Sequence, residues 1–142
     1  MGTAGHAKPG FGGMTVSKKA MQSEAKKWIE RFGIHARADQ LVGQISVPNQ
    51  QLLQIARAAS QEDFKILILD EPTSSLTANE TDHLFKIIRS LRDEGCAVVF
   101  VSHKMDEIFS LGDTVTVLRN GRSVGTYPMA EMHEAELIRL MS

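Results

Sequence analysis

ILILDEPTSSL occupies residues 66–76 and gives the clearest strand signal in this 142-residue chain. Four consecutive large aliphatic residues, too few for a helix and bounded by polar residues, predict a fully buried parallel strand. Asp70 and Glu71 follow at its carboxyl end, where open α/β sheets place their ligands. Pro72 stops any continuation, because it has no N–H and disfavours a helical Glu71. Such a pair fits metal-assisted phosphoryl transfer, with one acid holding Mg²⁺ and the other polarising water.

The alternative interpretation of this stretch is a strand that simply ends in two solvated acids. An isolated Asp-Glu pair would favour that alternative. The complete run from the aliphatic residues through Leu76 favours the functional interpretation instead.

A helix is predicted directly after this stretch. Thr77 and Glu80 have the spacing of a capping box, with Thr77 as the N-cap. The helix should end before Gly95, a residue suited to a helix terminus. Its predicted apolar face consists of Leu84, Ile87, Ile88 and Leu91.

A second apolar run at residues 97–101 predicts another buried strand. Strand, helix and strand at this spacing form a βαβ unit, whose crossover makes the two strands parallel and brings their carboxyl ends to one edge. We therefore expect His103 to lie close to Asp70 and Glu71. A lone histidine after a strand is more often structural or exposed to solvent, but this position favours a functional role.

The remaining segments predict helices at residues 17–32 and 132–141, a short helix closed by Gly112, and a β-hairpin. Asn120-Gly121 between two β-rich runs is a strong signal for a type I′ turn. The first helix should end at Gly33. The last helix should present one apolar face, made of Met132, Ala135, Ile138 and Met141, helped by Leu137.

Composition excludes several classes of protein. The chain is 42% hydrophobic and 23% charged, with a formal net charge of −1, which suits one soluble domain and argues against a nucleic-acid binder. Cys96 is the only cysteine, so no intrachain disulfide is possible and a reducing compartment fits. No apolar run approaches the roughly 18 residues of a membrane-spanning helix, and no signal-peptide pattern opens the chain.

The glycine-rich residues 1–16 predict a flexible terminus. A phosphate-binding P-loop needs Gly-x-x-x-x-Gly-Lys-Ser/Thr between a strand and a helix. Lys8 is followed by Pro9, with no hydroxyl residue at the metal position and no apolar strand before it. This segment is therefore not a P-loop.

Residues 66–76 resemble the Walker B segment and D-loop of ATP-binding cassette (ABC) ATPases. Leu76-Thr77 and the sequence from Leu91 onward resemble, more narrowly, the first cassette of the tandem-cassette sugar importers of the ribose, galactose and xylose group. The resemblance runs from about Gly10 to Ser142. It implies an α/β fold, the C-terminal part of a P-loop NTPase (ABC nucleotide-binding) domain with a partial helical subdomain. It also implies that the chain begins after the Walker A lysine, the adenine-stacking aromatic residue and the Q-loop glutamine.

The resemblance further implies a division of the chain. Residues 1–16 would be the flexible N-terminus, 17–60 a partial α-helical subdomain with a degenerate signature motif, and 61–142 the C-terminal part of the ATPase core. Ser46 and Gln51 fit the signature motif, whereas Val47 and Pro48 stand at its glycine positions. Proline has no N–H to offer a phosphate, although it suits the first turn of a helix.

The site implied by the resemblance uses seven residues. The expected roles are Asp70 for Mg²⁺, Glu71 as general base, His103 as γ-phosphate sensor, Ser74 and Ser75 in the D-loop at the contact between two cassettes, and Ser46 and Gln51 in the signature element presented to the opposite cassette. ATP and Mg²⁺ would be the ligands of the complete domain.

The implied function is ATP-driven sugar import. The protein would be cytoplasmic and peripheral on the cytoplasmic face of the inner (plasma) membrane. Its partners would be membrane permease subunits, a second cassette in a head-to-tail dimer and a periplasmic binding protein, with no nucleic acid. Because no Walker A or Q-loop is present, the chain alone is expected to be inactive. A non-catalytic interaction protein or a decayed remnant is therefore the alternative. An ABC ATPase of DNA repair or translation is less favoured, since coiled-coil insertions and basic linkers are missing.

Overall fold

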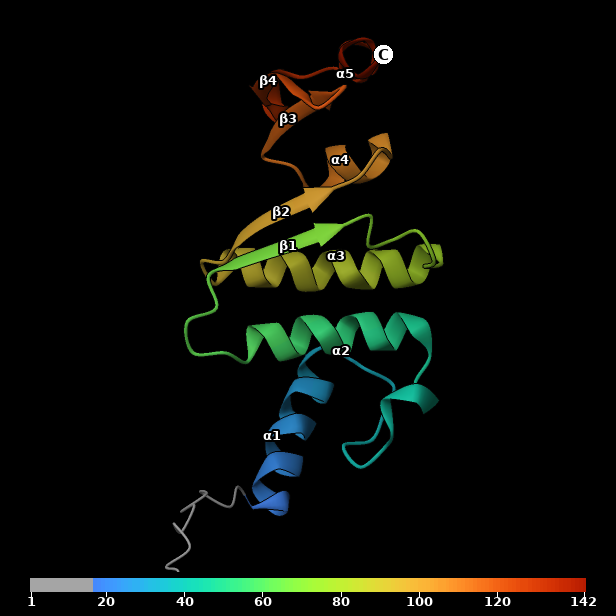
Figure 1. Cartoon of the computed structure of the whole chain (residues 1–142), viewed down its shortest axis with the longest axis vertical. Coiled ribbons are helices and arrows are strands. Elements are labelled where there is room, and N and C mark those ends of the chain that lie inside the picture. The colour runs from blue at the N-terminus through green and yellow to red at the C-terminus, as the bar shows by residue number, and fades with distance from the viewer. Residues whose placement is uncertain (1–16) are drawn as a thin grey trace, which may run out of the picture.

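The computed structural model describes residues 17–142, so the predicted flexible N-terminus lies outside the described part of the chain. The elements in chain order are α1 (Lys18–Arg31), η1 (Val42–Gln44), α2 (Val47–Ala59), β1 (Ile66–Asp70), α3 (Ala78–Asp93), β2 (Ala97–Val101), α4 (Met105–Leu111), β3 (Thr114–Arg119), β4 (Arg122–Pro128), η2 (Met129–Glu131) and α5 (Glu134–Met141). Figure 1 shows them as an elongated stack, with α1 near one end and α5 at the other. Within the described residues no helix combines the length and the apolar character needed to cross a membrane.

The predicted βαβ unit forms the middle of this stack. β1 and β2 pair in parallel, with Ile68 opposite Val99 and Asp70 opposite Val101. Their connection, α3, packs along one face of the two strands, and α2 lies on the other side of α3 (Figure 1). The main core therefore lies between these layers, where its buried members include Leu52, Ile55, Leu67, Leu84, Phe85, Ile88 and Leu91. The α/β fold predicted from the sequence is confirmed.

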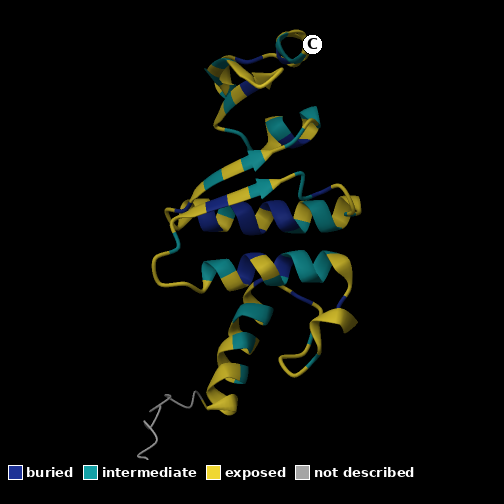
Figure 2. Ribbon diagram, in the orientation of Figure 1, coloured by how far each residue is buried: buried dark blue, intermediate teal, exposed yellow. Residues whose placement is uncertain are grey.

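The prediction that both strands are fully buried is wrong. Ile66 and Ile68 of β1 are 62% and 68% exposed, and Val99 and Val101 of β2 are 50% and 46% exposed. Leu67, between the two isoleucines, is buried. Only one face of the pair is covered, by α3, so successive side chains alternate between core and solvent (Figure 2). The four exposed side chains share the uncovered face, named below the bare sheet face.

Helix ends follow the predicted signals. The Thr77 hydroxyl accepts a hydrogen bond from the Glu80 N–H at 3.4 Å, and the Glu80 carboxylate accepts one from the Thr77 N–H at 2.8 Å, which completes the capping box. Gly33 and Gly95 follow α1 and α3 with φ of +57° and +96°, the left-handed conformation that glycine adopts without strain. Pro48 is the second residue of α2, where its missing N–H costs no helical hydrogen bond.

The C-terminal hairpin has its own small core. Asn120 and Gly121 have φ of +50° and +73°, so the predicted type I′ turn is confirmed. The core of this unit comprises Val117, Met132 and Leu137, with Met105 and Ile108 of α4 packed against it. The predicted apolar face of the last helix is wrong in part, because Ala135 and Ile138 are exposed. Met132 precedes α5 and follows the short η2, so it does not share one helical phase with the residues beyond it.

Candidate functional site

The carboxyl ends of β1 and β2 bring Glu71 and His103 together. The Glu71 N–H donates to the Val101 carbonyl at 2.9 Å, which extends the strand pairing by one residue. The Nδ1 atom of His103 lies 2.7 Å from Glu71 Oε1. Since a carboxylate can only accept, the Nδ1 atom carries the proton in this contact. The prediction that the crossover places His103 beside Glu71 is confirmed, and both side chains remain accessible to solvent.

The backbone of Glu71 is in an unusual conformation. Its φ is +46°, the left-handed region that residues with a Cβ adopt at a cost of about 1–2 kcal/mol. The loop that follows, residues 71–76 (the first loop), contains two backbone turns, with the N–H of Ser74 on the Glu71 carbonyl at 3.4 Å and that of Leu76 on the Thr73 carbonyl at 3.1 Å. Strained residues of this kind persist where surrounding contacts hold them, which is common at functional sites.

Asp70 lies at the end of β1, next to the Glu71–His103 pair. Its side chain is exposed and makes no hydrogen bond or ion pair with another residue of the range 17–142. Within that range no group of three or more acidic, histidine or cysteine side chains is placed to hold a metal ion. Mg²⁺ needs no such group, because it is commonly held by one or two carboxylates together with waters and phosphate oxygens. The free Asp70 carboxylate fits that mode of binding.

A buried polar cluster joins the first loop, the segment after β2 and α4, and it includes residues that were not predicted from the sequence. Glu107 of α4 is 3% exposed. Its carboxylate accepts hydrogen bonds from Thr73 at 2.5 Å and from Ser102 at 2.7 Å, and forms an ion pair with Lys104 at 3.2 Å. Burial by itself raises the pKa of Glu107, but the hydrogen bonds from Thr73, Ser102 and Lys104 outweigh it, so the pKa lies below its ordinary value. The carboxylate is therefore charged at neutral pH.

The sequence contains only a weak indication of this cluster, in the spacing of Thr73 and Glu107 from the pair. Thr73 is two residues beyond Glu71, and Glu107 is four residues beyond His103, one turn along the predicted short helix. However, Glu107 adjoins Asp106, and an acid in such a helix is usually solvated. Only the packing of α4 against the two strand ends shows that one of these acids is buried and the other is not.

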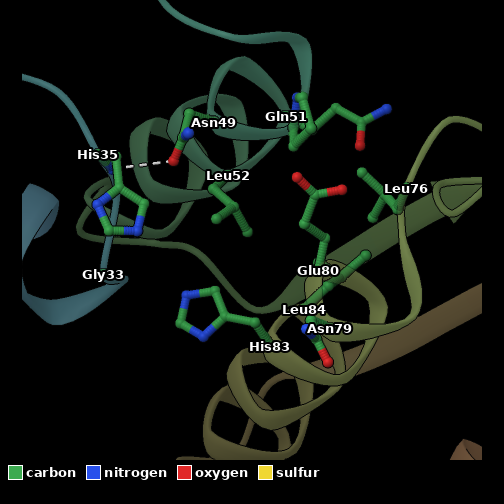
Figure 3. Close-up of a pocket in the computed structure, with 11 residues that line it drawn as sticks. Gly33, His35, Asn49, Gln51, Leu52, Leu76, Asn79, Glu80, His83 and Leu84 are labelled. Carbon is green, nitrogen blue, oxygen red and sulfur yellow. Dashed lines mark hydrogen bonds between the residues drawn. The ribbon is translucent and has the colours of Figure 1, made fainter.

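The predicted signature residues form a separate group on α2. Ser46 is the N-cap residue, and its hydroxyl accepts a hydrogen bond from the Asn49 side chain at 2.7 Å. Gln51 points into a pocket of about 250 Å³ between the start of α2 and the start of α3, which Leu76 and Glu80 also line (Figure 3). Gln51 Oε1 is buried and has no hydrogen-bond partner within the described residues.

The structure therefore brings together only part of the predicted site. Glu71 and His103 are in contact, with Asp70 adjacent. Ser74 and Ser75 are exposed in the first loop, and no hydrogen bond among residues 17–142 joins their side chains to the pair. Among the same residues, Ser46 and Gln51 likewise make no hydrogen bond to the pair. Gln51 is near the first loop only at the pocket that it lines together with Leu76.

Comparison with known proteins identifies a family and several relatives. A family model described as ABC transporter matches residues 2–74. A ribose import ATP-binding protein of Rubrobacter xylanophilus is 43% identical over 133 residues, which cover 94% of this chain and 26% of the relative. A galactose/methyl galactoside import ATP-binding protein of Escherichia coli K12 is 45% identical over 129 residues, which cover 91% of this chain and 25% of the relative. The chain thus spans about a quarter of the length of these relatives.

Solved structures show the same fold. An ABC transporter in an inward-facing conformation matches with a TM-score of 0.73 at 22% identity, over 84% of this chain and 48% of the other. An ATP-binding cassette of another ABC transporter matches with a TM-score of 0.70 at 19% identity, over 84% of this chain and 49% of the other. At this identity the likeness concerns the fold alone.

Proposed function

Because the chain belongs to the ABC transporter family, we propose that it supplies the hydrolytic edge of an ATP-binding cassette that powers sugar import. The observation that carries this proposal is the contact between Glu71 and His103 at the carboxyl ends of two parallel strands, with Asp70 as the last residue of the first strand. The relatives at 43–45% identity are ribose and galactose import proteins, which favours a sugar as the transported substrate.

The proposed chemistry assigns one task to each of the three side chains. Glu71 accepts a proton from the attacking water, for which its carboxylate must be charged. His103 donates from Nδ1 to Glu71, which fixes the imidazole; Nε2 can donate to a phosphate oxygen when the ring carries a second proton there. Asp70 would hold Mg²⁺, which neutralises charge on the phosphates when it is bound.

The remaining predicted residues belong to the surfaces between two cassettes. We place Ser74 and Ser75 in the D-loop and Ser46 and Gln51 in a signature element that meets ATP on a second cassette. Pro48 has no N–H for that phosphate, so this contact is weaker than one made with glycine there. Residues 17–60 would be the partial helical subdomain and residues 61–142 the partial ATPase core.

The proposal extends to the assembly. ATP with Mg²⁺ is the expected ligand of a complete domain, and permease subunits are the expected membrane partners. The chain would then lie on the cytoplasmic face of the inner membrane. The bare sheet face supports a second candidate function, a non-catalytic protein that docks on another chain, because contiguous exposed apolar side chains often mark an interface.

ATP hydrolysis tests the first proposal. The P-loop and Q-loop segment of the Rubrobacter relative is fused ahead of Gly10, and steady-state ATPase activity is measured. Glu71→Gln should leave ATP binding largely intact and reduce hydrolysis by about 10²–10⁴-fold, as for a lost general base. Glu62→Gln, which removes an exposed charge before β1, is the matched control and should leave activity unchanged. Equal hydrolysis by Glu71→Gln and the parent fusion would refute the role of Glu71.

A further inference from the structure

Glu107 connects the two loops that carry the Glu71–His103 pair. Residues 102–104 form the second loop, between β2 and α4. Oε1 of Glu107 accepts from Thr73 of the first loop, and Oε2 accepts from Ser102 of the second. The Lys104 ammonium lies 3.2 Å from Glu107 Oε1 and donates to the Thr73 hydroxyl, also at 3.2 Å.

The donors in this cluster flank the pair closely. Thr73 is two residues beyond Glu71, while Ser102 and Lys104 lie on either side of His103. Ser102 Oγ also accepts from the Lys104 N–H at 3.1 Å, which closes the second loop on itself. Apart from the Glu71–His103 contact, every side-chain hydrogen bond that joins the two loops within residues 17–142 involves Thr73. The Thr73 hydroxyl is bonded directly to Lys104, and it is linked to Ser102 through the carboxylate of Glu107.

From this geometry we propose that Glu107 is a positioning residue, which holds the first and second loops so that the Glu71 carboxylate faces Nδ1 of His103. The inference rests on the proposed function, in which this pair reacts. A carboxylate suits the task because it only accepts hydrogen bonds, so the hydroxyls of Thr73 and Ser102 must both donate to it and their rotamers are fixed.

A glutamine in place of Glu107 cannot reproduce this arrangement. Its amide offers one oxygen in place of two, and its NH₂ group would face a hydroxyl or the Lys104 ammonium. A valine in place of Thr73 has a similar shape but removes the only link from the first loop to Glu107 within the described residues. Both changes should release the left-handed Glu71 and separate its carboxylate from His103.

The ring nitrogens of His103 report this separation in the 142-residue chain itself. Two-dimensional ¹⁵N–¹H spectra of the imidazole distinguish a ring with its proton held on Nδ1 from one that exchanges between tautomers. Glu71→Ala, which removes the acceptor oxygen, gives the reference for a lost contact. In Glu107→Gln and Thr73→Val, the His103 nitrogen shifts should move at least halfway toward that reference. Thr73→Ser keeps the hydroxyl and should restore the parent spectrum.

Asp106→Asn is the matched control, since it removes a charge from the same helix at an exposed position. It should leave the His103 signals unchanged, and all the variants should leave the amide signals of the β3–β4 hairpin unchanged. Parent-like His103 signals in both Glu107→Gln and Thr73→Val would overturn the proposal. Unfolding of both would also overturn it, since the role would then be stability alone. Unchanged ATP hydrolysis by the Glu71→Gln fusion would refute the proposed function but not the positioning role of Glu107.

Discussion

The chain should self-associate through the bare sheet face, and replacing Ile68 with lysine should keep it monomeric. Ile68 lies at the centre of the bare sheet face, beside Ile66 and opposite Val99, and these side chains are on average more than half exposed. Full burial of such a side chain contributes about 1.5–3 kcal/mol, so the exposed area of the four-residue face represents about 4–5 kcal/mol per chain that burial would recover.

The expected affinity follows from that figure. Two chains that cover each other's face would gain about 9 kcal/mol, less an association cost of about 4 kcal/mol, which leaves a dissociation constant of about 0.2 mM. A lysine at position 68 would have to bury an unpaired charge in this contact, at a cost that exceeds the net gain. The folded chain should tolerate it, because surface substitutions usually change stability by less than about 0.5 kcal/mol.

Sedimentation velocity between about 10 µM and about 1 mM, which brackets that constant, is the assay. The parent chain should shift toward a dimer across the range, and Ile68→Lys should remain monomeric. Leu118→Lys is the matched control, since Leu118 is 71% exposed, like Ile68 at 68%, but lies on the other sheet. A parent chain that is monomeric throughout, with no binding of an apolar dye, would refute the reasoning, as would an equal effect of Leu118→Lys.

Three further outcomes are expected. The 142-residue chain should bind Mg-ATP weakly or not at all, because its sequence has no P-loop, and a micromolar dissociation constant by calorimetry would contradict this. Because the pKa of Glu107 is lowered in the folded chain, its contribution to the free energy of unfolding is present above its ordinary value of 4.5 and is lost as pH falls below it. Urea unfolding from pH 6 to pH 3 should therefore show a smaller pH dependence for Glu107→Gln than for the parent, and equal slopes would count against it. In the fusion, Pro48→Gly should raise ATP turnover of the dimer without tightening ATP binding to the monomer; unchanged turnover would exclude Pro48 as the weak point of the signature element.

Sequence patterns predicted the features that depend on residues close together in the sequence. The capping box at Thr77, the turn at Asn120-Gly121 and the meeting of Glu71 with His103 all follow from local rules and from the geometry of one crossover. These are short-range constraints, and the packing of other layers does not alter them.

Burial could not be predicted in the same way. The run from Ile66 to Leu69 is compatible with a strand covered on both faces, and only the position of α3 shows that one face is covered. Glu107 and Asp106 are adjacent acids on one helix, yet packing buries the first alone. Each of these outcomes depends on which helix or strand packs against the segment, and that packing is determined by residues far away in the sequence.

Helix α4 contacts two parts of the molecule at once. Its Met105 and Ile108 pack on the core of the C-terminal hairpin, while Glu107, between them in sequence, is bonded to the first and second loops. A helix of two turns cannot bend to separate these attachments. A shift of the hairpin that keeps its contacts with Met105 and Ile108 would therefore carry Glu107 with it, and would move the first and second loops on either side of the Glu71–His103 pair.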